Sequence, residues 1–91
     1  MEVNDKVYEA HAWSFGVMFY EYTIKEVCST GVWIIDKQHK DEQYALFADF
    51  ELHYSKTKAE AIDKCIKRYK MYIDDYEKRI KMLEEKKEKQ R

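Results

Sequence analysis

The chain has 91 residues, of which 45% are hydrophobic and 38% are charged, and its formal net charge is −1. This length allows one domain with a small core, and the hydrophobic content is too high for a disordered chain. Two cysteines are too few for a disulfide framework, and neither a signal peptide nor an apolar run of membrane-spanning length is visible, so we expect a reduced, cytoplasmic protein.

The first part of the chain predicts three β-strands joined by short turns. Residues 6–13 are rich in Val, Tyr and Trp, and a turn at residues 14–16 follows, where Gly16 tolerates a positive φ. Residues 17–28 alternate between apolar and polar side chains, with Met18, Tyr20, Tyr22 and Ile24 on one face. After a turn at residues 29–31, the apolar run at residues 32–35 predicts a central strand buried on both faces.

Residues 43–54, which follow a charged loop at residues 36–42, allow two interpretations. A helix is one of them, because Phe47, Phe50, Glu51 and Tyr54 have helical spacing. We predict a fourth strand instead, because six apolar residues alternate along this segment: Tyr44, Leu46, Ala48, Phe50, Leu52 and Tyr54.

The C-terminal part of the chain predicts one long helix over residues 57–88. Thr57 and Glu60 have the spacing of a capping box, and no Gly or Pro follows them. Such a helix would be roughly 45 Å long, whereas a strand of ordinary length spans about 20 Å, so about half of the helix should project beyond the sheet. We therefore predict an α+β fold in a single domain over residues 1–91, with a β-β-β-β-α order and the sheet within residues 6–54.

The apolar residues of this helix follow a heptad pattern with Ile62 as the first d position. Such a pattern is typical of a helix that pairs with another helix, and it predicts a homodimer. Two alternatives remain: the first half of the stripe covers the sheet and the second half binds another protein, or the whole stripe packs within the chain. The interface residues predicted here are Ile66, Tyr69, Ile73, Tyr76, Ile80 and Leu83.

The charges are distributed unevenly, which raises a nucleic-acid alternative. Residues 1–56 hold five Lys and ten Asp or Glu, a net charge of −5, and residues 57–91 hold twelve Lys or Arg and eight Asp or Glu, a net charge of +4. A basic helix face can follow a phosphate backbone, although Asp74 and Asp75 interrupt this one. The residues of this alternative are Lys64, Lys67, Arg68, Lys78 and Lys81.

No pattern in the chain predicts catalytic, cofactor or metal chemistry. The chain has no glycine-rich phosphate loop and no nucleophile elbow, and its potential metal ligands lack paired spacing: His11, His53, Cys28 and Cys65. A small ligand held between helix and sheet is a third hypothesis, with no motif behind it. Two readings of the aromatic residues also remain open, an exposed binding patch or core; these residues are Trp13, Phe15, Phe19, Trp33 and Phe47.

The segment Tyr54-Ser55-Lys56-Thr57-Lys58-Ala59-Glu60-Ala61-Ile62 reads as a strand that runs into a capped helix. In this, and in its size and its Tyr and Lys content, the chain resembles short accessory proteins of bacteriophages and mobile elements. The resemblance implies a non-enzymatic protein that binds and inhibits a host or defence protein. The segment is also similar to the small arm-binding domains of phage integrases, although their sheet is basic and this one is acidic.

Overall fold

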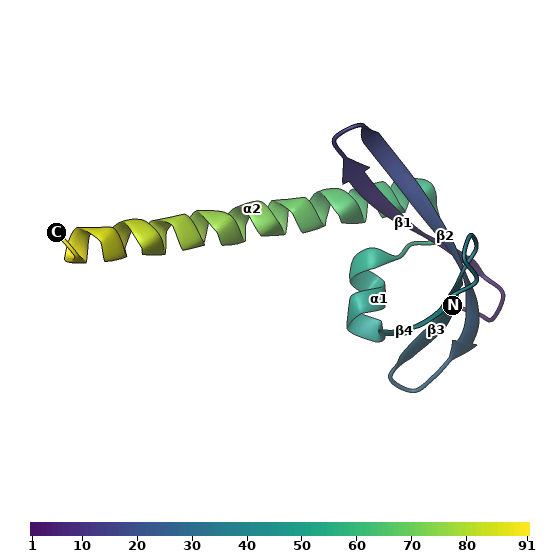
Figure 1. The fold of residues 1–91 in the computed structure, drawn as a ribbon. Coiled ribbons are helices and arrows are strands. Elements are labelled where there is room, and N and C mark those ends of the chain that lie inside the picture. The colour runs from purple at the N-terminus through teal and green to yellow at the C-terminus, as the bar shows by residue number, and fades with distance from the viewer.

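The computed structural model describes all 91 residues. A four-stranded antiparallel sheet is followed by one long C-terminal helix that projects from it (Figure 1), which confirms the predicted α+β fold. The strands lie in the sheet in their chain order. The elements are β1 (Lys6–Trp13), β2 (Gly16–Val27), β3 (Gly31–Asp36), β4 (Glu42–Leu46), α1 (Phe47–His53) and α2 (Lys58–Lys89).

The prediction of one strand over residues 43–54 is wrong in its second half, where the chain forms α1. The register explains the change, because Leu46 already pairs with Gly31, the first residue of β3. Beyond Leu46 the backbone has no strand left to pair with, and a helix satisfies its own hydrogen bonds. The helical spacing of Phe47 and Phe50 then brings both rings to the core.

Most of the core lies on the face of the sheet that α1 covers. Phe50 of α1 and Tyr54, the residue that ends α1, pack there on Val7 and on side chains of β2 and β3. The prediction that β3 is buried on both faces is wrong. Its buried residues Val32 and Ile34 face this core, whereas Trp33 and Ile35 point to the other face and are half-buried.

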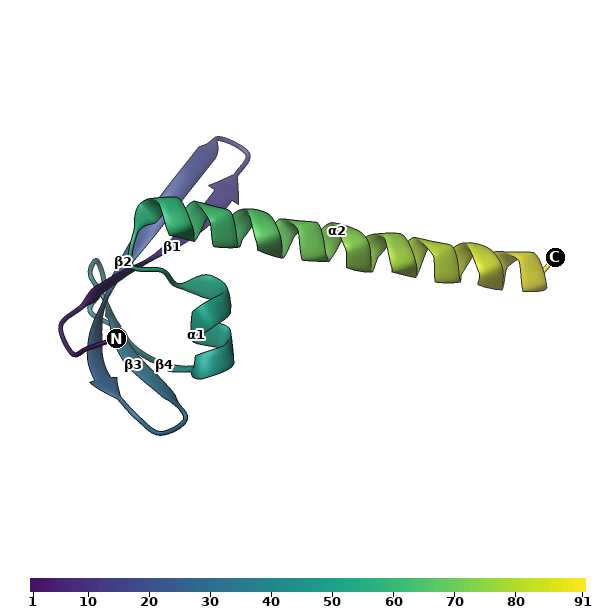
Figure 2. The same ribbon diagram turned by 180° about the vertical axis from the view of Figure 1, so that it is seen from behind.

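A smaller core lies on the opposite face, where α2 crosses β1. It consists of Ala10 of β1 with Ala61 and Cys65 of α2, flanked by Tyr8 and Phe19. Side chains this small let the helix backbone approach the strand closely. The sheet is therefore covered by α1 on one face and by the first turns of α2 on the other (Figure 2).

The segment between α1 and α2 covers the outer edge of β1. Ser55 exchanges two backbone hydrogen bonds with Tyr8, at 2.7 and 3.0 Å. Helix α2 then begins behind Thr57, whose side chain accepts a hydrogen bond from the Glu60 amide at 3.2 Å. This contact is the first half of the predicted capping box, and it places the start of α2 directly beside β1.

Only the first third of α2 packs on the rest of the chain. Its buried residues are Ala61, Cys65 and Arg68, and every residue from position 69 onward is exposed. The radius of gyration is 17.5 Å, whereas a compact chain of this length is expected to have about 12 Å. The prediction of a projecting helix is confirmed. No helix of the structure combines the length and the apolar character needed to span a bilayer.

Two buried tyrosines of the main core make stability sensitive to high pH. Burial raises the pKa of Tyr54 and of Tyr22 above the ordinary value, and the charge of Glu9 raises both further. The unfolded chain ionises these groups from about pH 10, while the folded chain keeps them neutral. Their contribution to stability is therefore complete below pH 10 and is lost above it.

We expect the free energy of unfolding to fall between pH 10 and 11, by up to about 1.4 kcal/mol per pH unit for each tyrosine. Urea unfolding at several pH values measures this slope for the wild type and for Tyr54→Phe. The variant should show a shallower decline, because it lacks one of the two ionising groups. Identical slopes for the two proteins would contradict this assignment.

Candidate interaction surface

The heptad stripe of α2 is the most extended accessible feature among the predicted sites. Its six predicted interface residues expose 43–69% of their surface and contact solvent along one side of the helix. From Ile66 to Leu83 the stripe is roughly 26 Å long. The structure therefore presents, on a projecting helix, an apolar seam that this chain covers only in part, at its Ile66 and Tyr69 end.

The projecting half of α2 has little to stabilise it within the chain. Ion pairs of the i,i+4 type join Asp74 to Lys78 at 3.1 Å and Asp75 to Arg79 at 2.9 Å. Each exposed pair of this type contributes only about 0.3–0.5 kcal/mol. Helices normally depend on packing of their apolar face, so this half of α2 has the character of a helix that requires a partner.

An apolar groove connects the stripe to the sheet. Tyr69 is one of its lining residues, and its hydroxyl donates a hydrogen bond to the Ala12 carbonyl oxygen at 3.1 Å. The groove has a volume of about 100 Å³ and no polar residue in its lining. It lies between α2 and the β1–β2 hairpin and is lined by Ala10, Ala12, Val17, Ile62, Cys65, Ile66 and Tyr69.

The hairpin that joins β1 and β2 carries a second exposed apolar surface. The rings of Trp13 and Phe15 are stacked, with centroids 6.4 Å apart, and expose 50% and 75% of their surface. The other aromatic residues left open by the sequence are half-buried: Phe19 packs on the small core, Phe47 on the main core and Trp33 on Tyr44. Of the two readings left open, exposed patch or core, the exposed one thus applies only to Trp13 and Phe15 at the hairpin tip.

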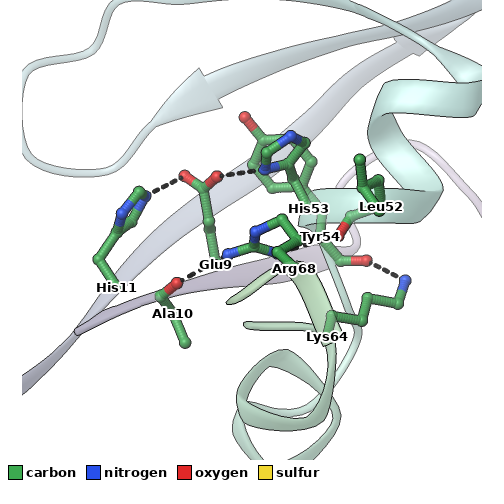
Figure 3. Close-up of polar contacts among 8 residues, drawn as sticks. All are labelled: Glu9, Ala10, His11, Leu52, His53, Tyr54, Lys64 and Arg68. Atoms are coloured by element: carbon green, nitrogen blue, oxygen red, sulfur yellow. Dashed lines mark hydrogen bonds and ion pairs between the residues drawn. The ribbon is translucent and has the colours of Figure 1, made fainter. Parts of the chain in front are cut away.

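Two of the five basic residues in the nucleic-acid alternative are engaged inside the chain, so their prediction as part of an exposed basic face is wrong. Arg68 is buried, and its guanidinium donates to the carbonyl oxygens of Leu52 at 2.9 Å and Ala10 at 3.0 Å (Figure 3). The half-buried Lys64 donates to the Tyr54 carbonyl oxygen at 2.6 Å. Both side chains join α2 to the segment around α1 instead of facing solvent.

The other three basic residues do not form a continuous basic face. Lys67 and Lys81 are exposed but lie roughly 21 Å apart along the helix. Lys78 lies between them and pairs with Asp74. The carboxylate of Asp74 therefore neutralises the middle of this face, as the sequence indicated.

A buried carboxylate that the sequence did not single out ties β1 to α1. Glu9 lies between two imidazoles, with His11 Nε2 at 3.2 Å and His53 Nδ1 at 3.2 Å (Figure 3). The His53 contact is close but not aligned as a hydrogen bond. No group of three or more His, Cys, Asp or Glu is arranged to hold a metal ion, and Cys28 and Cys65 are both free. The cluster is an internal polar contact between elements.

Sequence reasoning also missed the face by which α2 packs on the sheet. That face consists of Ala61, Cys65 and Arg68, one position away from the heptad residues Ile62 and Ile66. A signal in the sequence was the pair of small residues Ala61 and Cys65, four positions apart, because small side chains let a helix approach a strand closely.

The chain matches no protein-family model, no curated protein and no solved structure.

Proposed function

We propose that the chain is a non-enzymatic protein-interaction module whose binding surface is the heptad stripe of α2. The exposure of all six stripe residues carries this proposal, because an ordered apolar seam of this length is costly to leave in water. The chain exposes 7076 Å², whereas a compact monomer of 11.1 kDa is expected to expose about 5,700 Å². The excess exceeds the roughly 800 Å² that each partner buries in a standard interface.

The proposal extends to the mode of action and the location. A small domain that pairs through this helix can occlude a surface of another protein without any chemistry of its own. The resemblance to bacteriophage accessory proteins suggests an inhibitor of a host or defence protein that acts as a homodimer. A cytoplasmic location agrees with two cysteines that remain free thiols.

We do not extend the proposal to nucleic acid. Binding to a phosphate backbone requires cations that can reach the phosphates. Arg68 is buried and Lys64 is bound to a backbone carbonyl, and the exposed Lys78 lies beside the carboxylate of Asp74, which repels phosphate. Protein binding through the stripe makes use of residues that the fold leaves free.

Affinity capture from a bacterial lysate that also contains an untagged second copy of the chain tests this function. The baits are the wild type, the stripe variant Ile73→Asp/Ile80→Asp and the control Met71→Asp/Met82→Asp. The control residues are exposed methionines of the same helix that lie off the stripe. We expect a protein that the wild type and the control recover and the stripe variant does not. If the wild type and the control recover no protein that the stripe variant fails to recover, the proposed function is overturned.

A further inference from the structure

We propose that the stripe of α2 is covered by α2 of a second copy of this chain in antiparallel orientation. In this pair the Leu83 side chain of each copy enters the apolar groove of the other, between α2 and the β1–β2 hairpin. The inference rests on the proposed function, because it names the partner of the same surface. The two helices are related by a two-fold axis, which makes both ends of the interface identical.

One antiparallel register pairs every stripe residue. A shift by one heptad in one direction sets Leu83 against Ala59 and brings two Lys70 side chains together. A shift in the other direction sets Tyr69 against Lys87 and brings two Glu77 side chains together. In the central register Lys70 instead faces the partner's Glu77, and the seam pairs Ile66 with the partner's Leu83, Tyr69 with the partner's Ile80 and Ile73 with the partner's Tyr76.

The charge distribution selects the antiparallel orientation over the parallel one. Residues 78–91 hold seven Lys or Arg and three Asp or Glu, a net charge of +4, so the C-terminal end of the chain carries the whole positive excess of residues 57–91. Residues 1–56 carry −5. Antiparallel packing places the positive tail of one copy beside the acidic sheet of the other, whereas parallel packing places two positive tails together.

The local pairs beside the seam do not separate the two orientations. The antiparallel pair gains Lys70 against Glu77 but sets Asp63 near the partner's Glu84. The parallel pair gains Arg79 against Glu84 but sets Lys86 near the partner's Arg91. Each orientation thus has one attractive and one repulsive kind of pair. The attraction between the positive C-terminal tail of one copy and the acidic sheet of the other therefore decides the orientation.

The groove supplies the second argument for this orientation. Its lining includes Ile66, the residue that faces the partner's Leu83 in the central register. The partner's Leu83 thus lies beside Ala12 and Val17 of the hairpin, which form the opposite wall of the groove. In a parallel pair the two β1–β2 hairpins would lie side by side at the level of Ile66. The Leu83 side chains would then be at the other end of the interface, far from both grooves.

A distance between spin labels separates the orientations. A single nitroxide is placed at Glu85→Cys, on the side of α2 away from the stripe, in a chain that also carries Cys28→Ser and Cys65→Ala. Antiparallel packing displaces the two labels by roughly 30 Å along the helix axis, so we expect a distance of about 35 Å or more. Parallel packing holds them at the same level, at about 20 Å. The short distance would overturn the inference and leave the proposed function standing.

A variant of the sheet tests the groove itself. Val17→Asp places a charge in the groove without altering α2, and Met18→Asp places one on the opposite face of the same strand. We expect Val17→Asp to raise the dimer dissociation constant at least tenfold and Met18→Asp to leave it within about twofold. Equal effects would overturn the seating of Leu83. A wild-type chain that stays monomeric would overturn the whole inference, and the capture experiment would then decide the proposed function alone.

Discussion

The stripe variant Ile73→Asp/Ile80→Asp is expected to raise the dissociation constant of the dimer by at least about 100-fold, a loss of about 3 kcal/mol or more. Each copy contributes both substitutions, so four carboxylates would enter an apolar seam. A carboxylate moved into such a seam loses hydration and gains no partner. Sedimentation equilibrium of the variant and the wild type measures the change.

The control is Met71→Asp/Met82→Asp. These methionines expose 51% and 62% of their surface and lie on the side of α2 away from the stripe. The same charge enters the same turns of the helix, so any effect on helix propensity or net charge is matched. The control is expected to keep the dissociation constant within a few fold of the wild-type value. Equal weakening by both variants would mean that the stripe is not the interface.

The substitution Arg68→Met is expected to lower the free energy of unfolding by about 3 kcal/mol. Arg68 is buried and donates to the carbonyl oxygens of Leu52 and Ala10, which belong to α1 and β1. Methionine retains much of the apolar stem but leaves two carbonyl groups without their donor. It also removes a buried positive charge that acts on Tyr54 of the main core.

Urea unfolding measures this loss best in the background of Ile73→Asp/Ile80→Asp, because dimerisation would add a concentration-dependent term to stability. Lys67→Met is the control. It changes an exposed basic residue next to Arg68, and surface substitutions usually alter stability by less than about 0.5 kcal/mol. A loss for Arg68→Met as small as that of the control would show that the guanidinium does not hold the elements together.

Local patterns predicted most of this fold. Apolar and polar side chains alternate clearly along β2 because only one of its faces packs on the main core. The cap at Thr57 and the absence of Gly and Pro beyond it defined α2. The failure at residues 47–53 has a tertiary cause. Phe50 and Tyr54 fit both the strand and the helix pattern. The position of Gly31, the first residue of β3, decided between them, because β4 has no partner beyond it.

The candidate site was predictable in part. A heptad pattern depends only on spacing, so the stripe could be read from the residues and its placement on a projecting helix is confirmed. The packing face of α2 depends on the contact of Ala61 and Cys65 with Ala10, which are far apart in the chain. No local pattern distinguishes Arg68 from its exposed neighbour Lys67, because its burial arises where α1, α2 and β1 meet.

Molar mass by light scattering, over a wide range of wild-type concentrations, tests most directly whether a second copy covers the stripe of α2. We expect a mass near twice 11.1 kDa at high concentration, which falls toward 11.1 kDa on dilution. A mass of 11.1 kDa at every concentration would contradict self-association and would leave the stripe as a surface for a different protein.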